Sequence, residues 1–222
     1  MITALGYCSK GWQPHQDVFK QSLASYLKKD IKIYSQQSVG TFGASYNILA
    51  HQMMAEGHTV FAIANDDIVL RPDTWQTLQQ DWNLLKASTY PERQAAGVLA
   101  CRHDYVRMGP QNVRYNYGRA RAETVSYPEE QQIMLVKSIA PILAVYSAEA
   151  WVDFPEINWF SDDVQCYDMR RAGHTVWVSR AYCHHIGSMT MGRDNYEQEQ
   201  QQAIAWLEKN RPDLKNFLDS YV

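Results

Sequence analysis

The sequence predicts an α/β fold in which helices flank a mixed, mostly parallel β-sheet. Over residues 1–100, short apolar segments alternate with longer segments of helical periodicity, and such alternation is typical of β-α-β units with a parallel sheet. The length of 222 residues suits one domain with helices on both faces of its sheet. We therefore expect a single α/β domain.

The chain is expected to begin with a strand, a helix and a second strand. Residues 2–8 form a short apolar run. In the segment 16–29, apolar side chains recur every four positions from Phe19 to Leu27, which indicates an amphipathic helix. Residues 31–35 alternate between apolar and polar side chains, as a half-buried strand does.

A second helix is expected after a turn marked by Gly40 and Gly43. Its apolar side chains between Tyr46 and Met54 share one face. Gly57 is a usual residue at the end of a helix. The sequence therefore predicts a helix that ends there.

The third strand is expected at 59–64, because its continuous apolar composition is typical of a strand buried on both faces. It runs directly into Asn65. Pro72 starts a helix over 73–86, since proline is favoured in the first turn. Residues 95–101 are apolar and complete the series as a fourth strand.

The second half of the chain is less regular. Residues 102–130 contain glycine, proline, arginine and tyrosine without a clear period, which indicates a long loop or an irregular hairpin over one edge. Gly173 stops a helix that begins at Ser161. We expect strands at 133–139, 142–146 and 175–179, a short helix near 148–152, and longer helices at 161–171 and 195–210.

Charge and cysteine content exclude several classes of protein. The formal net charge of -3 and the pI of about 6.1 provide no basic field for nucleic acid or an anionic membrane. No apolar run approaches the roughly 18 residues of a membrane span, and the N-terminus does not resemble a signal peptide, so we expect a cytoplasmic protein. Four scattered cysteines without a CxxC pair indicate reduced thiols.

Three consecutive residues with side-chain oxygens stand where parallel sheets bind ligands. Asn65, Asp66 and Asp67 follow the third expected strand, and open α/β sheets bind ligands at the carboxyl ends of their strands. The side-chain oxygens could coordinate a divalent cation, which would neutralise a diphosphate. The alternative is a simple turn, because Asn and Asp favour turns by themselves.

Two later segments carry further candidate groups. Asp162 and Asp163 follow Ser161 at the expected start of a helix, where a carboxylate could act as a general base but would also stabilise the helix end. His184 and His185 follow the last expected strand. Because side chains alternate along a strand, only one of these histidines should reach a site shared with the acids. Two ordinary partly buried histidines are the alternative.

Together these segments resemble the family-2 glycosyltransferases of the GT-A fold, over most of the chain. Residues 38–70, SVGTFGASYNILAHQMMAEGHTVFAIANDDIVL, resemble the family's Gly-rich turn, Asn-bearing helix and strand with the acidic metal motif. FSDDVQCYDMRRAGH resembles the helix start that carries the catalytic base, and HHIGSMT resembles the late His-x-Gly-Ser-x-Thr segment. SIAPILAVYSAEAW resembles the strand pair that lines the sugar pocket.

The resemblance implies an inverting, metal-dependent glycosyltransferase of the hexosyltransferase type. It would move a sugar from a nucleotide-sugar donor, with a UDP-sugar as the expected class, to a hydroxyl of a saccharide or another acceptor. Either Asp162 or Asp163 would be the catalytic base, and Asp67 with His185 would hold Mn²⁺ or Mg²⁺. The residues implied in nucleotide-sugar binding are Tyr7, Ser9, Gln36, Asn47, Asn65 and Asp66.

The same resemblance divides the expected GT-A domain into two halves. Residues 1–100 would form a nucleotide-binding half, and residues 101–222 an acceptor-side half with the catalytic base and the C-terminal helix. Neither nucleic acid nor a membrane span is expected as part of this function.

Two other functions remain open from the sequence. A sugar nucleotidyltransferase should carry a Gly-rich loop with Arg or Lys after its first strand, whereas CSKGWQPH offers one glycine and one lysine there. A non-catalytic module would bind a nucleotide-sugar without turning it over, and only an assay separates that module from an enzyme.

Overall fold

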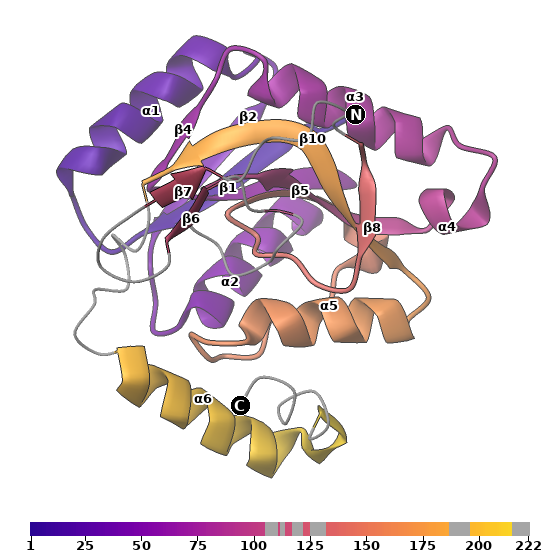
Figure 1. Ribbon diagram of the computed structural model, residues 1–222. Helices are drawn as coiled ribbons and strands as arrows, with labels where there is room; N and C mark the ends of the chain where they lie inside the picture. Colours follow the sequence, from indigo (N-terminus) through magenta and orange to yellow (C-terminus); the bar gives the residue numbers. More distant parts are fainter. Residues whose placement is uncertain (105–110, 112–113, 117–121, 125–131, 187–195, 215–222) are drawn as a thin grey trace.

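The computed structural model describes most of the chain (Figure 1). The described residues are 1–104, 111, 114–116, 122–124, 132–186 and 196–214. Residues 187–190, which belong to the HHIGSMT segment, lie outside them.

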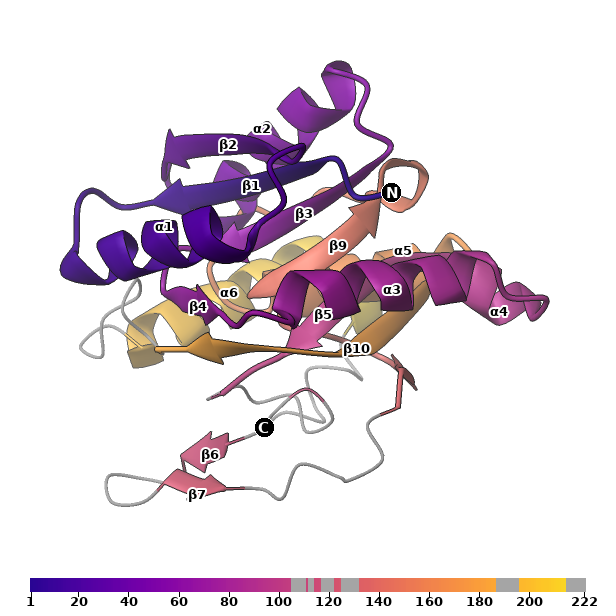
Figure 2. The same cartoon turned by 90° about the horizontal axis from the view of Figure 1, so that it is seen from above.

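One mixed sheet forms the centre of the protein. Its strands follow the order β2 (Lys32–Gln37), β1 (Ala4–Ser9), β3 (Val60–Asn65), β9 (Leu143–Ser147), β5 (Ala96–Arg102), β10 (Thr175–His185) and β4 (Ile68–Leu70), with β8 (Met134–Val136) also paired to β10. β2, β1, β3, β5 and β10 run in one direction, and β9, β4 and β8 run in the other. The fold is thus the mixed, mostly parallel α/β architecture that the sequence predicts, and Figure 2 shows the strands β2, β1, β3, β9, β5 and β10 side by side.

Helices cover both faces of this sheet (Figure 1). On one face, α1 (Pro14–Tyr26) and α3 (Thr74–Lys86) bury Phe19, Trp75 and Trp82 against the strands. On the other face, α2 (Phe42–Ala55) and α5 (Ser161–Arg171) bury Leu49 and Met169. Burial of these large side chains supplies the main free energy that holds the layers together.

A third apolar cluster attaches the C-terminal helix. Ala203 and Leu207 of α6 (Tyr196–Asn210) pack with Ile157, Phe160 and Val164, at and before the start of α5. Figure 1 shows α6 beside α5, away from the sheet. The remaining short elements are α4 (Pro91–Gln94), η3 (Ala148–Ala150), η4 (Pro212–Leu214) and a separate pair of strands, β6 (Arg114–Asn116) and β7 (Ala122–Thr124).

Three sequence predictions about elements were wrong in detail. The last strand continues to His185 instead of stopping at Ser179, and the unexpected strand β4 pairs with its extended end. The strand expected at 133–139 is shortened to β8. Gly43 lies inside α2, not in the preceding turn. The two strand boundaries follow from pairing with distant segments, whereas Thr41 caps the start of α2 locally, because its side chain accepts from Ala44 N.

Two other predictions, on the cysteines and on Gly57, are confirmed. All four cysteines are buried and free. Gly57 has a φ of 87°, a left-handed conformation that glycine adopts at a helix end. Within the described part of the chain, no helix is long and apolar enough to cross a membrane.

Candidate active site

The two acids that follow β3 face different neighbours. Asp66 is buried against the start of α1, where its carboxylate accepts a hydrogen bond of 2.6 Å from Gln16 Nε2 and lies 3.8 Å from His15 Nε2. Burial raises the pKa of Asp66, and the charge of Asp67 raises it further, against the hydrogen bond from Gln16. Asp66 therefore lies on the β1 side of the strand end.

Asp67 lies on the opposite side, next to His185. Its Oδ2 is 3.4 Å from His185 Nε2, and both side chains are buried. The pairing of β4 with the end of β10 creates this contact, because Ile68 pairs with His185 and the carbonyl of Asp67 accepts from Ile186 N at 2.9 Å. The structure thus brings together the two residues that the sequence suggested as metal ligands.

The adjacent histidines point away from each other, as alternation along a strand requires. The side chain of His185 is 8% exposed and that of His184 is 42% exposed. His184 Nδ1 lies 2.7 Å from Asp104 Oδ2, and His185 Nδ1 lies 3.0 Å from the Asp104 carbonyl oxygen. Only His185 faces Asp67.

The Asp67 and His185 pair offers donor atoms that suit Mn²⁺. A carboxylate oxygen and an imidazole nitrogen are common ligands of such cations. Among the residues that the structure describes, no group of three or more His, Cys, Asp or Glu side chains is arranged to hold a metal ion. A cation at this pair would need further oxygen ligands from water and a bound diphosphate, as Mg²⁺ and Mn²⁺ sites commonly use.

His103 and Asp104 belong to the same site, although the sequence reasoning missed them. They follow β5, and the ring centroid of His103 lies 5.7 Å from that of His185. Burial, and then the neighbouring His185, lowers the pKa of His103 to about 3, so this imidazole is neutral. The rule that pointed to the residues after β3, polar groups at the carboxyl end of a strand, would have found them.

Asp162 and Asp163 open α5. Phe160, immediately before the helix, has a φ of 63°, which is uncommon for a residue other than glycine and turns the chain into the helix. Asp163 is 6% exposed, and its Oδ1 accepts from Ser138 Oγ at 2.6 Å. Asp162 is largely buried but keeps some exposed surface, and its Oδ1 accepts from Asp163 N. Burial and the adjacent charge of Asp163 raise the pKa of Asp162.

A short segment connects this acidic pair with the end of β5. Ser138 contacts Asp163, while two residues later Ala140 N donates to Gln111 Oε1 at 2.8 Å. Gln111 Nε2 in turn donates to the carbonyl oxygens of Cys101 and Ala140. The segment 138–140 is therefore fixed between α5 and the strand edge that carries His103.

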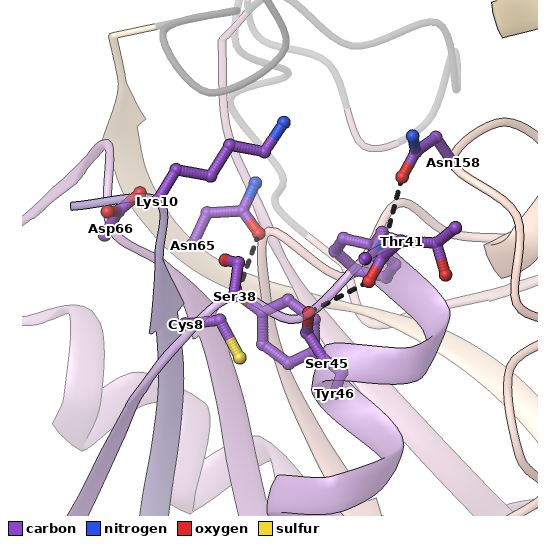
Figure 3. A pocket seen from close by; sticks show the side chains of 11 residues that line it. Cys8, Lys10, Ser38, Thr41, Ser45, Tyr46, Asn65, Asp66 and Asn158 are labelled. Atoms are coloured by element: carbon purple, nitrogen blue, oxygen red, sulfur yellow. Dashed lines mark hydrogen bonds between the residues drawn. The ribbon is translucent and has the colours of Figure 1, made fainter.

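A pocket opens at the carboxyl ends of β1, β2 and β3 (Figure 3). Asn65 and Asp66 line it, and Tyr46 Oη, from α2, donates to the Ala64 carbonyl oxygen at 2.7 Å behind them. Open α/β sheets bind ligands at this edge. The other lining residues are Cys8, Lys10, Ser38, Gly40, Thr41, Phe42, Ser45, Tyr46 and Asn158.

The fold is also similar to that of known structures. A197 from STIV is 13% identical, with a TM-score of 0.50, over 80% of this chain and 81% of that chain. S. aureus TarS 1-349 in complex with UDP-GlcNAc is 12% identical, with a TM-score of 0.51, over 90% of this chain and 64% of that one. The protein has the GT-A fold.

A further GT-A structure, GalNAc-T7 with UDP, GalNAc and Mn²⁺, is 10% identical, with a TM-score of 0.51, over 83% of this chain and 43% of that chain. The chain thus spans less than two thirds of the TarS and GalNAc-T7 chains. No protein-family model and no curated protein matches the chain. At this level of identity, the comparisons establish the fold of the protein.

Within this GT-A fold, the other residues suggested for nucleotide-sugar binding have mainly internal contacts. Tyr7 packs edge-on against Phe19 in the core, with ring centroids 5.0 Å apart. Both polar atoms of the Asn47 side chain bind the backbone of Phe154 at 2.9 Å. The backbone carbonyl of Ser9 accepts from Ser38 N, and Gln36 Nε2 donates to the Ser45 carbonyl oxygen. Their part in donor binding stays a prediction.

Lys10 and Asn158 line the GT-A pocket but were not among the suggested site residues. Lys10 follows β1 in the sequence, so the strand-end rule applies to it as well. Asn158 reaches the pocket from a distant loop, where its Oδ1 accepts from Phe42 N at the start of α2 (Figure 3). No local sequence signal could place Asn158 there.

Proposed function

We propose that the protein is an inverting, metal-dependent glycosyltransferase that moves a hexose from a nucleotide-sugar, in the UDP-sugar class, to an acceptor hydroxyl. One observation carries the proposal. At one edge of a GT-A sheet, a buried carboxylate and a buried imidazole, Asp67 and His185, face each other at 3.4 Å. The two residues before Asp67, Asn65 and Asp66, line a pocket at the same edge. This chemistry suits a cation that binds a diphosphate.

The ligands of the compared structures support the donor class. TarS 1-349 is in complex with UDP-GlcNAc, and GalNAc-T7 is with UDP, GalNAc and Mn²⁺. A UDP-sugar and Mn²⁺ or Mg²⁺ are therefore the first ligands to test on this protein.

In this proposal, Asp67 and His185 hold the cation. When bound, the cation supplies positive charge that stabilises the departing nucleoside diphosphate. Asn65 and Asp66 lie two residues and one residue before Asp67, and they line the pocket, where they would bind the ribose or a water molecule on the cation. Gln16 and His15 fix the Asp66 carboxylate in this position.

Asp162 is the proposed catalytic base. It would take the proton of the acceptor hydroxyl, whose oxygen then attacks C1 of the donor sugar from the face opposite the diphosphate, which inverts the anomeric centre. Asp162 keeps exposed surface, whereas Asp163 is buried and bound by Ser138. Asp163 would thus hold the start of α5 in place.

Release of nucleoside diphosphate tests the proposal. The substrates are UDP-, GDP- and dTDP-sugars, each with Mn²⁺, Mg²⁺ or chelator, and the variants are Asp67→Asn and Asp73→Asn. Asp73 is an exposed acid whose side chain makes no capping hydrogen bond, so it is a matched control. We expect metal-dependent release from UDP-sugars in the wild type and in Asp73→Asn, and a loss of at least about a hundredfold in Asp67→Asn.

Two results would contradict the proposal. Release of nucleoside diphosphate that is insensitive to chelator would show that the reaction does not need a cation. Tight binding of a UDP-sugar without turnover, in the presence of a panel of saccharide acceptors, would favour a non-catalytic binding module.

A further inference from the structure

The residues around His185 assign a role to three side chains that the proposed function does not use. His185 Nδ1 lies 3.0 Å from the backbone carbonyl oxygen of Asp104. A carbonyl oxygen only accepts hydrogen bonds, so Nδ1 must carry the hydrogen. The other ring nitrogen, Nε2, is the atom that faces Asp67 Oδ2 at 3.4 Å.

Asp104 is itself held firmly by its side chain. It is 0% exposed, and its Oδ2 accepts from Tyr182 Oη at 2.5 Å and lies 2.7 Å from His184 Nδ1. Hydrogen bonds to a buried carboxylate are among the stronger ones in proteins. The carboxylate therefore fixes the backbone at Asp104, and with it the carbonyl that meets His185.

One strand supplies all the parts of this arrangement. Tyr182 and His184 lie two residues apart on β10 and share one face of the strand, while His185 points to the other. Asp104 contacts both faces, with its carboxylate on one and its carbonyl on the other. The two adjacent histidines thus have different roles. His184 binds the carboxylate of Asp104, and the carbonyl of Asp104 binds His185.

We propose that Asp104, held by Tyr182 and His184, is the positioning residue of His185. Its backbone carbonyl accepts a hydrogen bond from Nδ1–H, so Nε2 keeps its free electron pair and faces Asp67. A histidine that binds a metal through one ring nitrogen usually donates the N–H of its other ring nitrogen to such a partner, which fixes the tautomer and the ring orientation. The link to metal binding rests on the proposed function, whereas the tautomer does not.

The tautomer of His185 can be read without metal or substrate. Long-range ¹H–¹⁵N NMR of histidine-labelled protein distinguishes the two tautomers, at about pH 9, where an ordinary imidazole is neutral. The signal of His185 is identified by its loss in His185→Gln. We expect the Nδ1–H form in the wild type and a mixture of both forms in Tyr182→Phe and His184→Phe.

Binding of Mn²⁺ in the presence of UDP, measured by electron paramagnetic resonance against a sample without protein, is the second readout, because the cation needs oxygen ligands from a diphosphate as well. Loss of an outer partner of a metal-bound histidine typically weakens affinity by about 10–100-fold, and we expect this loss in Tyr182→Phe and His184→Phe. His184→Gln keeps a hydrogen-bond donor for Asp104, so it should bind Mn²⁺ more tightly than His184→Phe does. His51→Phe is the matched control, because His51 forms an exposed pair with Asp153.

The outcomes separate this proposal from the proposed function. An Nε2–H tautomer in the wild type, or an unchanged His185 signal in both Phe variants that fold normally, would overturn the positioning role. An Nδ1–H wild type with mixed tautomers in the variants, but no Mn²⁺ binding in any protein, would support the positioning role and contradict metal dependence.

Discussion

Asp162 and Asp163 are neighbours whose carboxyl groups have different surroundings. Asp163 is bound by Ser138 and buried, whereas Asp162 keeps exposed surface next to it. Burial raises the pKa of Asp162, and the adjacent charge of Asp163 raises it further, because two carboxyl groups this close resist ionising together. The two residues should therefore respond differently to the same substitution.

Asp162→Asn should lower kcat by at least about a hundredfold while the affinity for the donor stays nearly unchanged, because a general base acts on the acceptor. Asp163→Asn should retain more activity and lose thermal stability instead, since Asp163 holds Ser138. Steady-state kinetics and donor binding by calorimetry check this. Equal activity in the two variants would contradict the assignment of the catalytic base to Asp162.

The raised pKa of Asp162 also predicts how stability depends on pH. A carboxyl whose pKa is higher in the folded state stabilises that state fully below the unfolded pKa, and the contribution is lost as pH rises through the folded pKa. Asp162→Asn removes this loss. The melting temperature of Asp162→Asn minus that of the wild type should therefore increase as the pH is raised from about 4 to about 9. A difference that stays constant with pH would contradict the shift.

At the scale of elements, the loop before α5 is attached to the start of α2. Asn158 Oδ1 accepts from Phe42 N, and the side chain of Asn47 binds both backbone groups of Phe154. Gly43 allows this close approach, because a Cβ at that position would lie 2.1 Å from the Pro155 carbonyl oxygen. One loop thus connects the pocket with the helix of the proposed base.

Gly43→Ala should destabilise the protein by about 1–3 kcal/mol, the usual cost of overpacking, despite the roughly 1 kcal/mol that alanine gains in a helix. It should also lower activity, since the shifted loop leads to Asp162. Chemical denaturation and the diphosphate assay measure both effects. Ile48→Ala, on the exposed face of the same helix, is the control, with an expected change of under about 0.5 kcal/mol. A stability of Gly43→Ala equal to the wild type would show that the contact relaxes freely.

At the scale of the whole molecule, the candidate site joins segments from most of the chain. Asp67 follows β3, Asp104 follows β5, Asp162 opens α5 and His185 ends β10. A ligand that contacts several of these segments binds the folded state and not the unfolded chain, so it must raise the unfolding free energy.

UDP with Mn²⁺ should therefore raise the melting temperature, with a stabilisation of about 2.7 kcal/mol when the ligand is at a hundred times its Kd. Chelator or Asp67→Asn should abolish the part that depends on the metal. Differential scanning fluorimetry over a range of UDP concentrations gives this result. A melting temperature that does not respond to UDP at any metal concentration would contradict a nucleotide site.

The sequence alone determined the α/β class, the alternation over the first hundred residues and the position of the acids after β3. These features depend on local periodicity and on the general rule that ligands bind at strand ends, and both are visible in the order of residues. The resemblance of the motifs gave the GT-A fold, which the comparisons confirm, and the site residues, which stay predictions.

Only the tertiary structure decided which side chains meet. The length of β10 and the presence of β4 depend on their pairing with each other, and this pairing places His185 against Asp67 and His184 against Asp104. Asn158 enters the pocket because a loop more than a hundred residues along the chain packs on α2. Such contacts are set by the packing of distant segments, and no local pattern in the sequence encodes them.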